Sequence, residues 1–263
     1  MQLEKVTKHI VNWLKDYVAK SGTKGFVIGI SGGIDSALTS TLCALTGKPV
    51  LCVEMPIHQP QNQVDRSYAH IKWLKNNYPS VSFVKVSLTE VYDNLISALP
   101  TVKNEESRLM ALVNTRARLR MTALYYFAGL HKYLVAGTGN KVEDFGVGFF
   151  TKYGDGGVDL SPIADLTKTE VYALAKYLGI NKAIIVAPPT DGLWGDDRTD
   201  EDQLGATYPE LEWAMEMTDK NFKSTDFTGR QKEVFDIYNK LHQANKHKME
   251  PIPVCKIPDA FIQ

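Results

Sequence analysis

The chain of 263 residues carries 30 Lys and Arg against 30 Asp and Glu, so its formal net charge is zero. It has no basic excess of the kind that neutralises a nucleic-acid backbone, and no acidic excess typical of a disordered chain. With 44% hydrophobic and 10% aromatic residues, the composition is that of an ordinary globular protein, long enough to bury one sizeable core. These numbers argue against nucleic acid as a partner.

The sequence also gives no indication of a membrane protein or of a zinc site. No apolar run approaches the length of a membrane span, and the N-terminal MQLEKVTKHIVNWLK is charged and amphipathic, unlike a signal peptide. Cys43, Cys52 and Cys255 show no CxxC spacing, so they are expected to be small buried hydrophobes in a reducing compartment. The sequence therefore predicts a cytoplasmic protein with no membrane partner.

Helix-like and strand-like patterns alternate along the first two thirds of the chain. Short apolar runs such as GFVIGI (25–30) are typical of strands covered on both faces. The other predicted strands are 49–56, 81–87 and 132–137. Predicted helices cover 2–20, 36–46, 61–77, 88–99, 104–130 and 167–178. The glycine-rich stretch 145–157 is too irregular for either element.

This alternation predicts an α/β fold, a doubly wound parallel sheet flanked by helices. After residue 188 the pattern becomes rich in loops, with predicted helices at 210–218 and 228–245 and then a Pro-rich tail. We therefore expect a single domain over 1–263. Its α/β core would span 1–187, and a C-terminal appendage of lid loop, helices and tail would span 188–263.

The segment GISGGIDSALTS (29–40) follows the first predicted strand and opens the next helix. Gly32 and Gly33 allow a sharp turn in which backbone N–H groups point into one concavity, beside the positive end of the helix. Such a nest suits a phosphate or pyrophosphate group, and the hydroxyls of Ser31 and Ser36 can add donors. Asp35 would repel phosphate, which points to a Mg²⁺ ion that bridges its carboxylate to the phosphate oxygens.

Simpler interpretations of this segment exist. A strand–turn–helix corner with Asp35 or Ser36 as the helix N-cap would give a similar sequence. A Walker A loop would need a Lys that the segment lacks, and the glycine spacing is not that of G-x-G-x-x-G. The combination S-G-G-x-D-S therefore favours a phosphate site outside the kinase and dehydrogenase classes.

SGGIDS resembles the PP-loop of the ATP pyrophosphatases, which cleave ATP to AMP and pyrophosphate and activate a carboxyl or carbonyl oxygen as an adenylate. Within that group the chain is similar to the ammonia-dependent NAD synthetases from about residue 5 to about residue 260. The resemblance is carried by NTRARLRM (114–121), AGTGNKVED (136–144), GFFTKYGDGGVD (148–159), LTKTEVY (166–172), PPTDGL (188–193) and KHKMEP (246–251).

This resemblance implies the ATP-dependent amidation of deamido-NAD (nicotinate adenine dinucleotide) to NAD with ammonia. It further implies an adenylated carboxylate intermediate, AMP and pyrophosphate as by-products, and Mg²⁺ as cofactor. The core 1–187 would bind the nucleotide. The protein would be a homodimer with the deamido-NAD site at the subunit interface.

Site residues follow from the resemblance position by position. The catalytic residues would be Asp35, Glu143 and Lys168, and the metal ligands Asp35 and Glu143. The residues in contact with ATP would be Gly29, Ile30, Ser31, Gly32, Gly33, Ile34, Asp35, Ser36, Thr138, Lys168 and Thr190. The residues in contact with deamido-NAD would be Arg118, Lys152, Asp159, His247 and Lys248.

Two assignments, those of the second metal ligand and of Asp155, stay open at this point. Relative to the family pattern, one residue is inserted between Glu143 and Gly154. Counting forward from Thr138 therefore selects Glu143 as the second metal ligand, whereas counting back from GFFTKYGD selects Asp144. We favour Glu143 because the preceding strand end is the more rigid anchor. Asp155 is equally compatible with turn chemistry and with the site. Of the arginines in NTRARLRM, Arg116 and Arg120 share a helix face and are expected in ordinary salt bridges, whereas Arg118 points elsewhere.

The implied chemistry needs no nucleophilic Ser or Cys, but it needs water to be excluded from the adenylate, and the loops 140–158 and 193–208 are the candidate lids. Two other functions remain possible. One is another adenylating PP-loop enzyme, as in tRNA thiolation or GMP synthesis, against which the zero net charge and the absence of candidate catalytic cysteines count. The other is a nucleotide-binding module without catalysis, against which both candidate metal carboxylates count.

Overall fold

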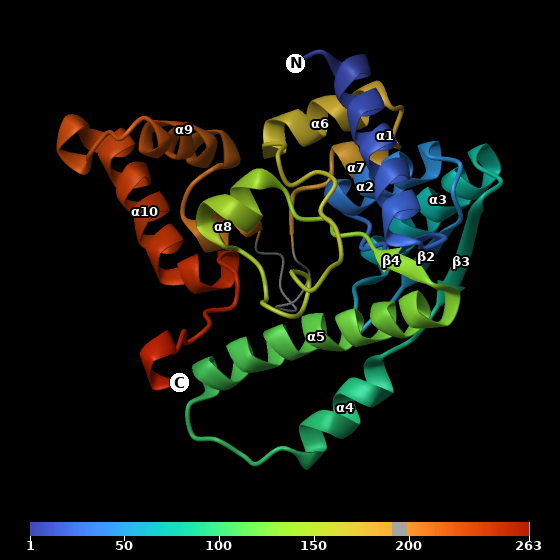
Figure 1. Cartoon of the computed structure of the whole chain (residues 1–263), viewed down its shortest axis with the longest axis horizontal. Coiled ribbons are helices and arrows are strands. Elements are labelled where there is room, and N and C mark those ends of the chain that lie inside the picture. Colours follow the sequence, from blue (N-terminus) through green and yellow to red (C-terminus); the bar gives the residue numbers. More distant parts are fainter. Residues whose placement is uncertain (191–198, 263) are drawn as a thin grey trace.

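The computed structural model describes residues 1–190 and 199–262 of the chain. Among these residues a parallel sheet of four strands runs in the order β3-β2-β1-β4 (Figure 1). The strands are β1 (Gly25–Gly29), β2 (Val50–Glu54), β3 (Val81–Lys85) and β4 (Tyr133–Val135). The structure thus confirms the predicted parallel α/β sheet.

Helices cover both faces of the sheet. One face carries α1 (Leu3–Ser21), α2 (Ile34–Leu45), α3 (Gln61–Asn77), α6 (Lys168–Tyr177) and α7 (Lys182–Ile185). The other carries α4 (Thr89–Ala98) and α5 (Glu105–His131). Because successive strand side chains point to opposite faces, Phe26 and Ile28 enter the first core and Val27 enters the second. This two-sided cover is the doubly wound arrangement that the sequence predicts.

Local capping signals set where several helices begin. At the start of α6 the Thr167 hydroxyl accepts a hydrogen bond from the Glu170 N–H, and the Thr167 N–H donates to the Glu170 carboxylate, which is a capping box. Asn104 accepts a bond from the Ser107 N–H and so caps α5. The capping box matters for the site because it makes Lys168 the first residue of α6.

The strand order creates a crevice at one edge of the sheet. β1 lies between β2 and β4, so the chain proceeds from β1 outward to β2 and β3 and later returns to β4 on the opposite side. In doubly wound folds, ligands bind outside the carboxyl ends of the strands at this point of reversal. The glycine-rich loop after β1 and Thr138 after β4 both lie there.

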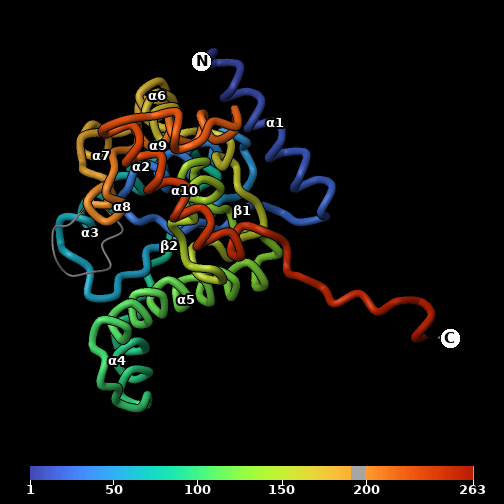
Figure 2. Tube along the Cα trace, turned by 90° about the vertical axis from the view of Figure 1, so that its left-hand side faces the viewer, coloured from blue at the N-terminus to red at the C-terminus, as the bar shows by residue number. Residues whose placement is uncertain are grey.

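The C-terminal helices pack mainly against the connection that follows β4. They are α8 (Asp200–Leu204), α9 (Tyr208–Asp219) and α10 (Gly229–Met249), with the short turns η2 (Ser224–Asp226) and η3 (Asp259–Phe261). Their apolar side chains form a third core with Val142 and Val147 of η1 (Val142–Val147). Beyond α10 the tail extends away from the rest of the chain (Figure 2). The helical appendage is therefore joined to the core through η1.

Some elements differ from the prediction. The stretch 145–157, expected to be irregular, begins inside η1, which is a π-helix. The single-turn helices α7 and α8 escaped detection because an element of one turn cannot repeat an apolar period. Of the predicted lid 193–208, residues 193–198 lie outside the described residues, and part of the remainder forms α8.

Two further predictions concern membrane spans and the burial of the cysteines. In the part of the chain that the structure describes, no helix is both long and apolar enough to cross a bilayer. Cys43 and Cys52 are buried, as predicted, and burial raises the pKa of the Cys52 thiol to about 12. Cys255, which was expected to be buried, is instead exposed on the tail.

Candidate functional site

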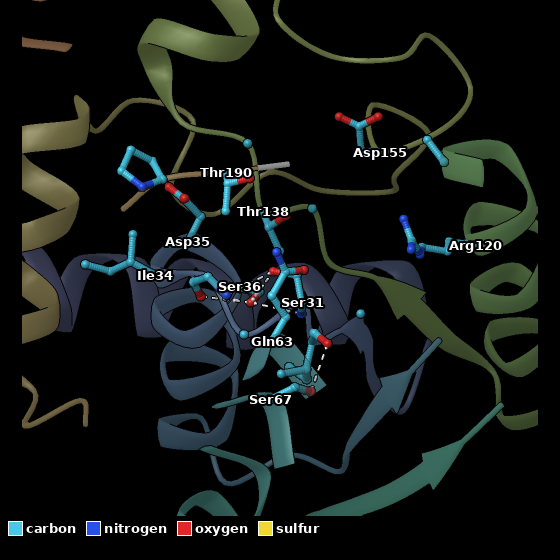
Figure 3. A pocket seen from close by; sticks show the side chains of 18 of the residues that line it. Ser31, Ile34, Asp35, Ser36, Gln63, Ser67, Arg120, Thr138, Asp155 and Thr190 are labelled. Atoms are coloured by element: carbon cyan, nitrogen blue, oxygen red, sulfur yellow. Dashed lines mark hydrogen bonds between the residues drawn. The ribbon is translucent and has the colours of Figure 1, made fainter. Parts of the chain in front are cut away.

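A pocket with a cavity of about 300 Å³ opens at the carboxyl edge of the sheet (Figure 3). The β1–α2 loop, the end of β4, the start of α6 and the segment that follows α7 all contribute to its wall. Every residue of the predicted ATP-binding set lines it, from Gly29–Ser36 to Thr138, Lys168 and Thr190. The fold thus gathers into one cavity residues that lie up to 161 positions apart, the span from Gly29 to Thr190.

The glycine-rich loop forms the floor of this pocket. Gly32 has φ +84°, and a Cβ there would lie 2.7 Å from the Gln63 carbonyl oxygen, so only glycine fits. Gly33 is the N-cap of α2 and supplies no side chain, which rules out the alternative in which Asp35 or Ser36 caps the helix. The Ser31 hydroxyl accepts a bond from the Gly33 N–H at 3.2 Å and lies 3.1 Å from the Ser36 hydroxyl. A helix N-terminus without a side-chain cap beside two hydroxyls suits an anion.

Three charged side chains meet above this floor. The ammonium of Lys168 lies 2.6 Å from Asp35 Oδ2 and 2.9 Å from Glu143 Oε1. Lys168 is 3% exposed, and the two carboxylates are 18% and 15% exposed. Residues from α2, η1 and α6 therefore converge on one point of the pocket wall.

The charges of this cluster determine the pKa values of its members. Burial opposes the ionised form of all three groups, but the two carboxylates together raise the pKa of Lys168 above its ordinary value, so it stays charged. The charge of Lys168, with hydrogen bonds from Tyr208 and Lys168, keeps the pKa of Glu143 below its ordinary value despite burial. One ammonium cannot balance two carboxylates, so burial and the charge of Glu143 raise the pKa of Asp35. The cluster can therefore accept a further positive charge.

Glu143 lies in η1, which is a π-helix. A π-helix accommodates one residue more than an α-helix of similar length, and it often occurs at functional sites. Asn140 fixes its start, because its side-chain oxygen accepts bonds from the N–H groups of Val142 and Glu143, each at 3.1 Å. Its amide also donates to Asp35 Oδ1 at 3.2 Å. Asn140 thus ties the backbone of Glu143 to the side chain of Asp35.

Asp144 also lines the pocket, but it takes a different position. Its carboxylate packs on Gly139, where a Cβ would lie 2.0 Å from one of its oxygens. Burial and then the charges of Glu143, Asp155 and Asp35 raise the pKa of Asp144 to about 8. It is Glu143, and not Asp144, that shares Lys168 with Asp35, so the geometry favours Glu143 as the partner of Asp35.

Several residues in or beside the pocket were missed by sequence reasoning. Asp200 lines the pocket, and the Tyr208 hydroxyl donates to Glu143 Oε1 at 2.5 Å, across 65 positions in the sequence. The capping pattern of Thr207 and Glu210 indicates that a helix begins at Tyr208, but it does not indicate the direction of the Tyr208 side chain. Arg120, expected in an ordinary salt bridge, lines the pocket and donates to the Met55 carbonyl at 3.1 Å.

The residues predicted to bind deamido-NAD lie outside this pocket, and four of them form a connected group. The Lys152 ammonium donates to the His247 carbonyl at 2.7 Å, and the Arg118 guanidinium donates to the Lys152 carbonyl at 3.3 Å. Lys248 at the end of α10 donates to the Phe150 carbonyl at 2.7 Å. Asp159 lies apart from this group, because its carboxylate accepts bonds from the Val135 N–H and from the Tyr125 hydroxyl.

The donor set of the pocket agrees with a magnesium ion shared with phosphate. Within residues 1–190 and 199–262, no three His, Cys, Asp or Glu side chains are grouped so as to hold a metal by themselves. Magnesium sites at phosphates typically use one or two carboxylates, with phosphate oxygens and waters as the remaining ligands. Asp35 and Glu143 already converge on one cation, the Lys168 ammonium, so the two carboxylates fit that pattern.

Known proteins are similar to this chain over most of its length. The NAD synthase family matches residues 6–252. Two curated relatives, each named NH(3)-dependent NAD(+) synthetase, come from Archaeoglobus fulgidus and Carboxydothermus hydrogenoformans. The first is 37% identical over 98% of this chain and 99% of its own. The second is 38% identical over 86% of this chain and 91% of its own.

Two solved structures extend the comparison. One is described as NMN synthetase from Francisella tularensis, with a TM-score of 0.84 and 29% identity over 98% of this chain and 99% of its own. The other is the NH3-dependent NAD synthetase from Campylobacter jejuni in complex with nitrate ion, with a TM-score of 0.79 and 26% identity over 97% of this chain and 100% of its own. With both the family match and these relatives spanning almost the whole chain, the protein belongs to the NAD synthase family and is an enzyme of the ligase class.

Proposed function

We propose that the enzyme amidates deamido-NAD to NAD with ammonia, consuming ATP and releasing AMP and pyrophosphate. The observation that carries this proposal is the convergence of Asp35, Glu143 and Lys168 directly above the SGGIDS loop. This arrangement combines an anion nest with a buried group of charges that can hold a metal–phosphate complex. The ammonia-dependent relatives point to the same reaction.

The first step would be adenylation. A carboxylate oxygen of the nicotinate ring attacks the α-phosphorus of ATP, and the bond from that phosphorus to the bridging oxygen breaks, so pyrophosphate leaves. The N–H groups and hydroxyls of Ser31–Ser36 would receive the pyrophosphate, and Lys168 would stabilise its charge. Mg²⁺ held by Asp35 and Glu143 would supply further neutralisation of the phosphate charge.

The second step would be amide formation. Ammonia attacks the carbonyl carbon of the mixed anhydride, the bond from that carbon to the AMP oxygen breaks, and the nitrogen loses a proton. Oxide is a very poor leaving group, whereas AMP is a good one, which is why adenylation precedes the attack. Thr138 and Thr190 would hold the AMP part of the substrate at the pocket wall. The loop 140–158, which contains η1, would limit access of water to the anhydride.

The group around Lys152 would bind deamido-NAD in a homodimer. Arg118 of this group lies on α5, and of the 27 residues of α5 Val113, Ala117 and Ala128 are buried. Its large apolar side chains Tyr126 and Leu130 are 65% and 60% exposed. A second subunit on this face would bury them and bring the Lys152 group to the interface. The cytoplasmic location expected from the sequence stays a prediction.

A second candidate substrate follows from the Francisella structure. The likeness to that protein, described as NMN synthetase, exceeds the likeness to the Campylobacter enzyme in both TM-score and identity. Nicotinate mononucleotide carries the same ring carboxylate as deamido-NAD but lacks the AMP half of the dinucleotide. The same adenylation and amidation steps would convert it to the amide mononucleotide.

One assay tests the proposal. The purified enzyme is mixed with ATP, Mg²⁺ and ammonium, with either deamido-NAD or nicotinate mononucleotide, and the amide product, AMP and ADP are measured by chromatography. We expect NAD and AMP in equal amounts, with kcat/KM higher for deamido-NAD. ADP instead of AMP would refute adenylation, and a higher kcat/KM for the mononucleotide would select the second candidate. ATP binding without pyrophosphate release would indicate a non-catalytic nucleotide-binding module.

Asp35→Asn tests the role of the Asp35 carboxylate, since it preserves the shape of the side chain and removes its charge. We expect turnover to fall by at least about 100-fold while the circular dichroism spectrum is retained.

A further inference from the structure

Tyr208 is the one residue of the described chain whose side chain joins the C-terminal appendage to Glu143 by a hydrogen bond. Its hydroxyl donates to Glu143 Oε1 at 2.5 Å, the same oxygen that lies 2.9 Å from Lys168 Nζ. The Lys168 ammonium also lies 4.8 Å from the centre of the Tyr208 ring. Tyr208 is 4% exposed, so these contacts are made in a buried setting.

The position of Tyr208 is fixed by its own surroundings. It is the first residue of α9, where Thr207 and Glu210 form a capping box. Its backbone N–H donates to the Glu201 carboxylate of α8 at 2.8 Å. Its ring packs in the third core with Val142 of η1 and Leu211 of α9. The hydroxyl is therefore presented to Glu143 by a rigid element.

Glu143 has side-chain torsions that its backbone contacts do not fix. Asn140 holds the Glu143 N–H, but the carboxylate could still turn about its own bonds. The Tyr208 hydroxyl and the Lys168 ammonium both hold the same oxygen, so together they fix the plane and direction of the carboxylate. Hydrogen bonds of this kind orient carboxylates that bind metals, and their loss typically weakens metal affinity or activity about 10- to 100-fold.

We infer that Tyr208 is a positioning residue that orients the Glu143 carboxylate toward magnesium–ATP. This inference rests on the proposed function, because it takes Glu143 to be a metal ligand. It makes the C-terminal appendage part of the phosphate site through a residue that never needs to touch the substrate itself.

Tyr208→Phe tests this inference because it removes the hydroxyl and keeps the ring. Tyr238→Phe is the matched control, since Tyr238 is 2% exposed in the same core and lies outside the pocket. Calorimetry would measure the binding of an ATP analogue with a methylene group between the α and β phosphorus atoms, in Mg²⁺ and in EDTA. We expect Tyr208→Phe to weaken binding about 10- to 100-fold in Mg²⁺ and to leave it unchanged in EDTA. Tyr238→Phe should match the wild type in both.

A double mutant tests whether the hydroxyl acts through Glu143. In the Glu143→Gln background, adding Tyr208→Phe should weaken Mg²⁺-dependent binding no further, because the two groups act as a unit. A further loss as large as in the wild-type background would overturn the inference, as would equal binding by Tyr208→Phe and Tyr238→Phe. A wild type that forms no amide product in the assay above would refute the proposed function, whereas normal product with equal binding by the two variants would refute the role of Tyr208 alone.

Discussion

At the scale of single residues, the site depends on an imbalance among its buried charges. Asp35, Glu143 and Lys168 leave one negative charge in excess in a setting where unpaired charges are costly. In the proposed site, that excess would favour a cation beside the bound phosphate. A metal–phosphate complex would satisfy both needs, which would explain an acidic residue in a loop that suits anions.

Buried polar residues away from the pocket also respond to pH. His70 of α3 is fully buried, with Nε2 2.9 Å from the Ser40 hydroxyl and its ring stacked on Trp73. Burial lowers the pKa of His70 to about 4, against an ordinary value of 6.5. Between these two values the unfolded chain binds more protons than the folded chain, so stability falls as pH falls.

We therefore expect the free energy of unfolding to decrease from pH 6.5 toward pH 4, with His70 contributing up to roughly 3 kcal/mol of that loss. Urea unfolding of the wild type and of His70→Gln at several pH values measures it. The variant should show a flatter dependence in this window. His131→Gln, which changes an exposed histidine, should keep the wild-type slope. Equal slopes for the wild type and His70→Gln would contradict the prediction.

At the scale of elements, η1 links the core to the appendage. α10 side chains bond to its carbonyls: His242 Nδ1 lies 2.7 Å from the Gly146 oxygen, and Asn245 donates to the Val147 oxygen at 2.8 Å. Such bonds satisfy carbonyl groups near the end of a π-helix. The wide turn of η1 is thus held in place by α10.

Two glycines with similar left-handed backbones allow the cost of backbone strain to be measured apart from the cost of a steric clash. Gly148 ends η1 with φ +65°, and a Cβ there would lie 2.4 Å from Asn245 Cβ; Gly179 has φ +72° and nothing within 4 Å. Gly179→Ala should cost about 1 kcal/mol of unfolding free energy from the left-handed backbone alone. Gly148→Ala should cost that and about 1–3 kcal/mol more, because α10 must shift. Urea unfolding measures both, and equal losses would mean that α10 does not press on η1.

At the scale of the whole molecule, zero net charge conceals local segregation. Carboxylates gather on one side of the pocket with Lys168, whereas Arg118, Lys152 and Lys248 gather outside it. The bulk number argues against a nucleic-acid partner but carries no information about binding of small polyanions. The proposed subunit interface on α5 would bring the basic group into a shared site.

The proposed homodimer would have a solution mass of twice the 29.4 kDa chain. Tyr126→Glu with Leu130→Glu places two charges on the exposed face of α5 and should shift the protein toward the monomer, because desolvating unpaired charges opposes association. Tyr177→Glu, a change of the same kind on the exposed part of α6, should leave the mass unchanged. Sedimentation velocity measures all three proteins. A wild-type monomer, or a double variant that stays dimeric, would exclude this interface.

The sequence by itself determined the parallel sheet and the glycine-rich turn after β1. Buried strands such as 25–30 are continuous apolar runs, and Gly32 takes a left-handed backbone that favours glycine, so both features depend on neighbouring residues. Only the family resemblance placed Asp35 and Lys168 in one site, since the two residues lie 133 positions apart in the sequence.

Only the tertiary structure showed that Glu143, and not Asp144, shares the Lys168 ammonium with Asp35, because this contact depends on how η1 and α6 are placed in space. It also brought Tyr208 to Glu143 and Arg120 to the pocket, and it set the group around Lys152 outside the pocket. Local patterns record the secondary structure of a residue, but the direction in which a side chain points across the molecule is fixed by the packing of distant helices.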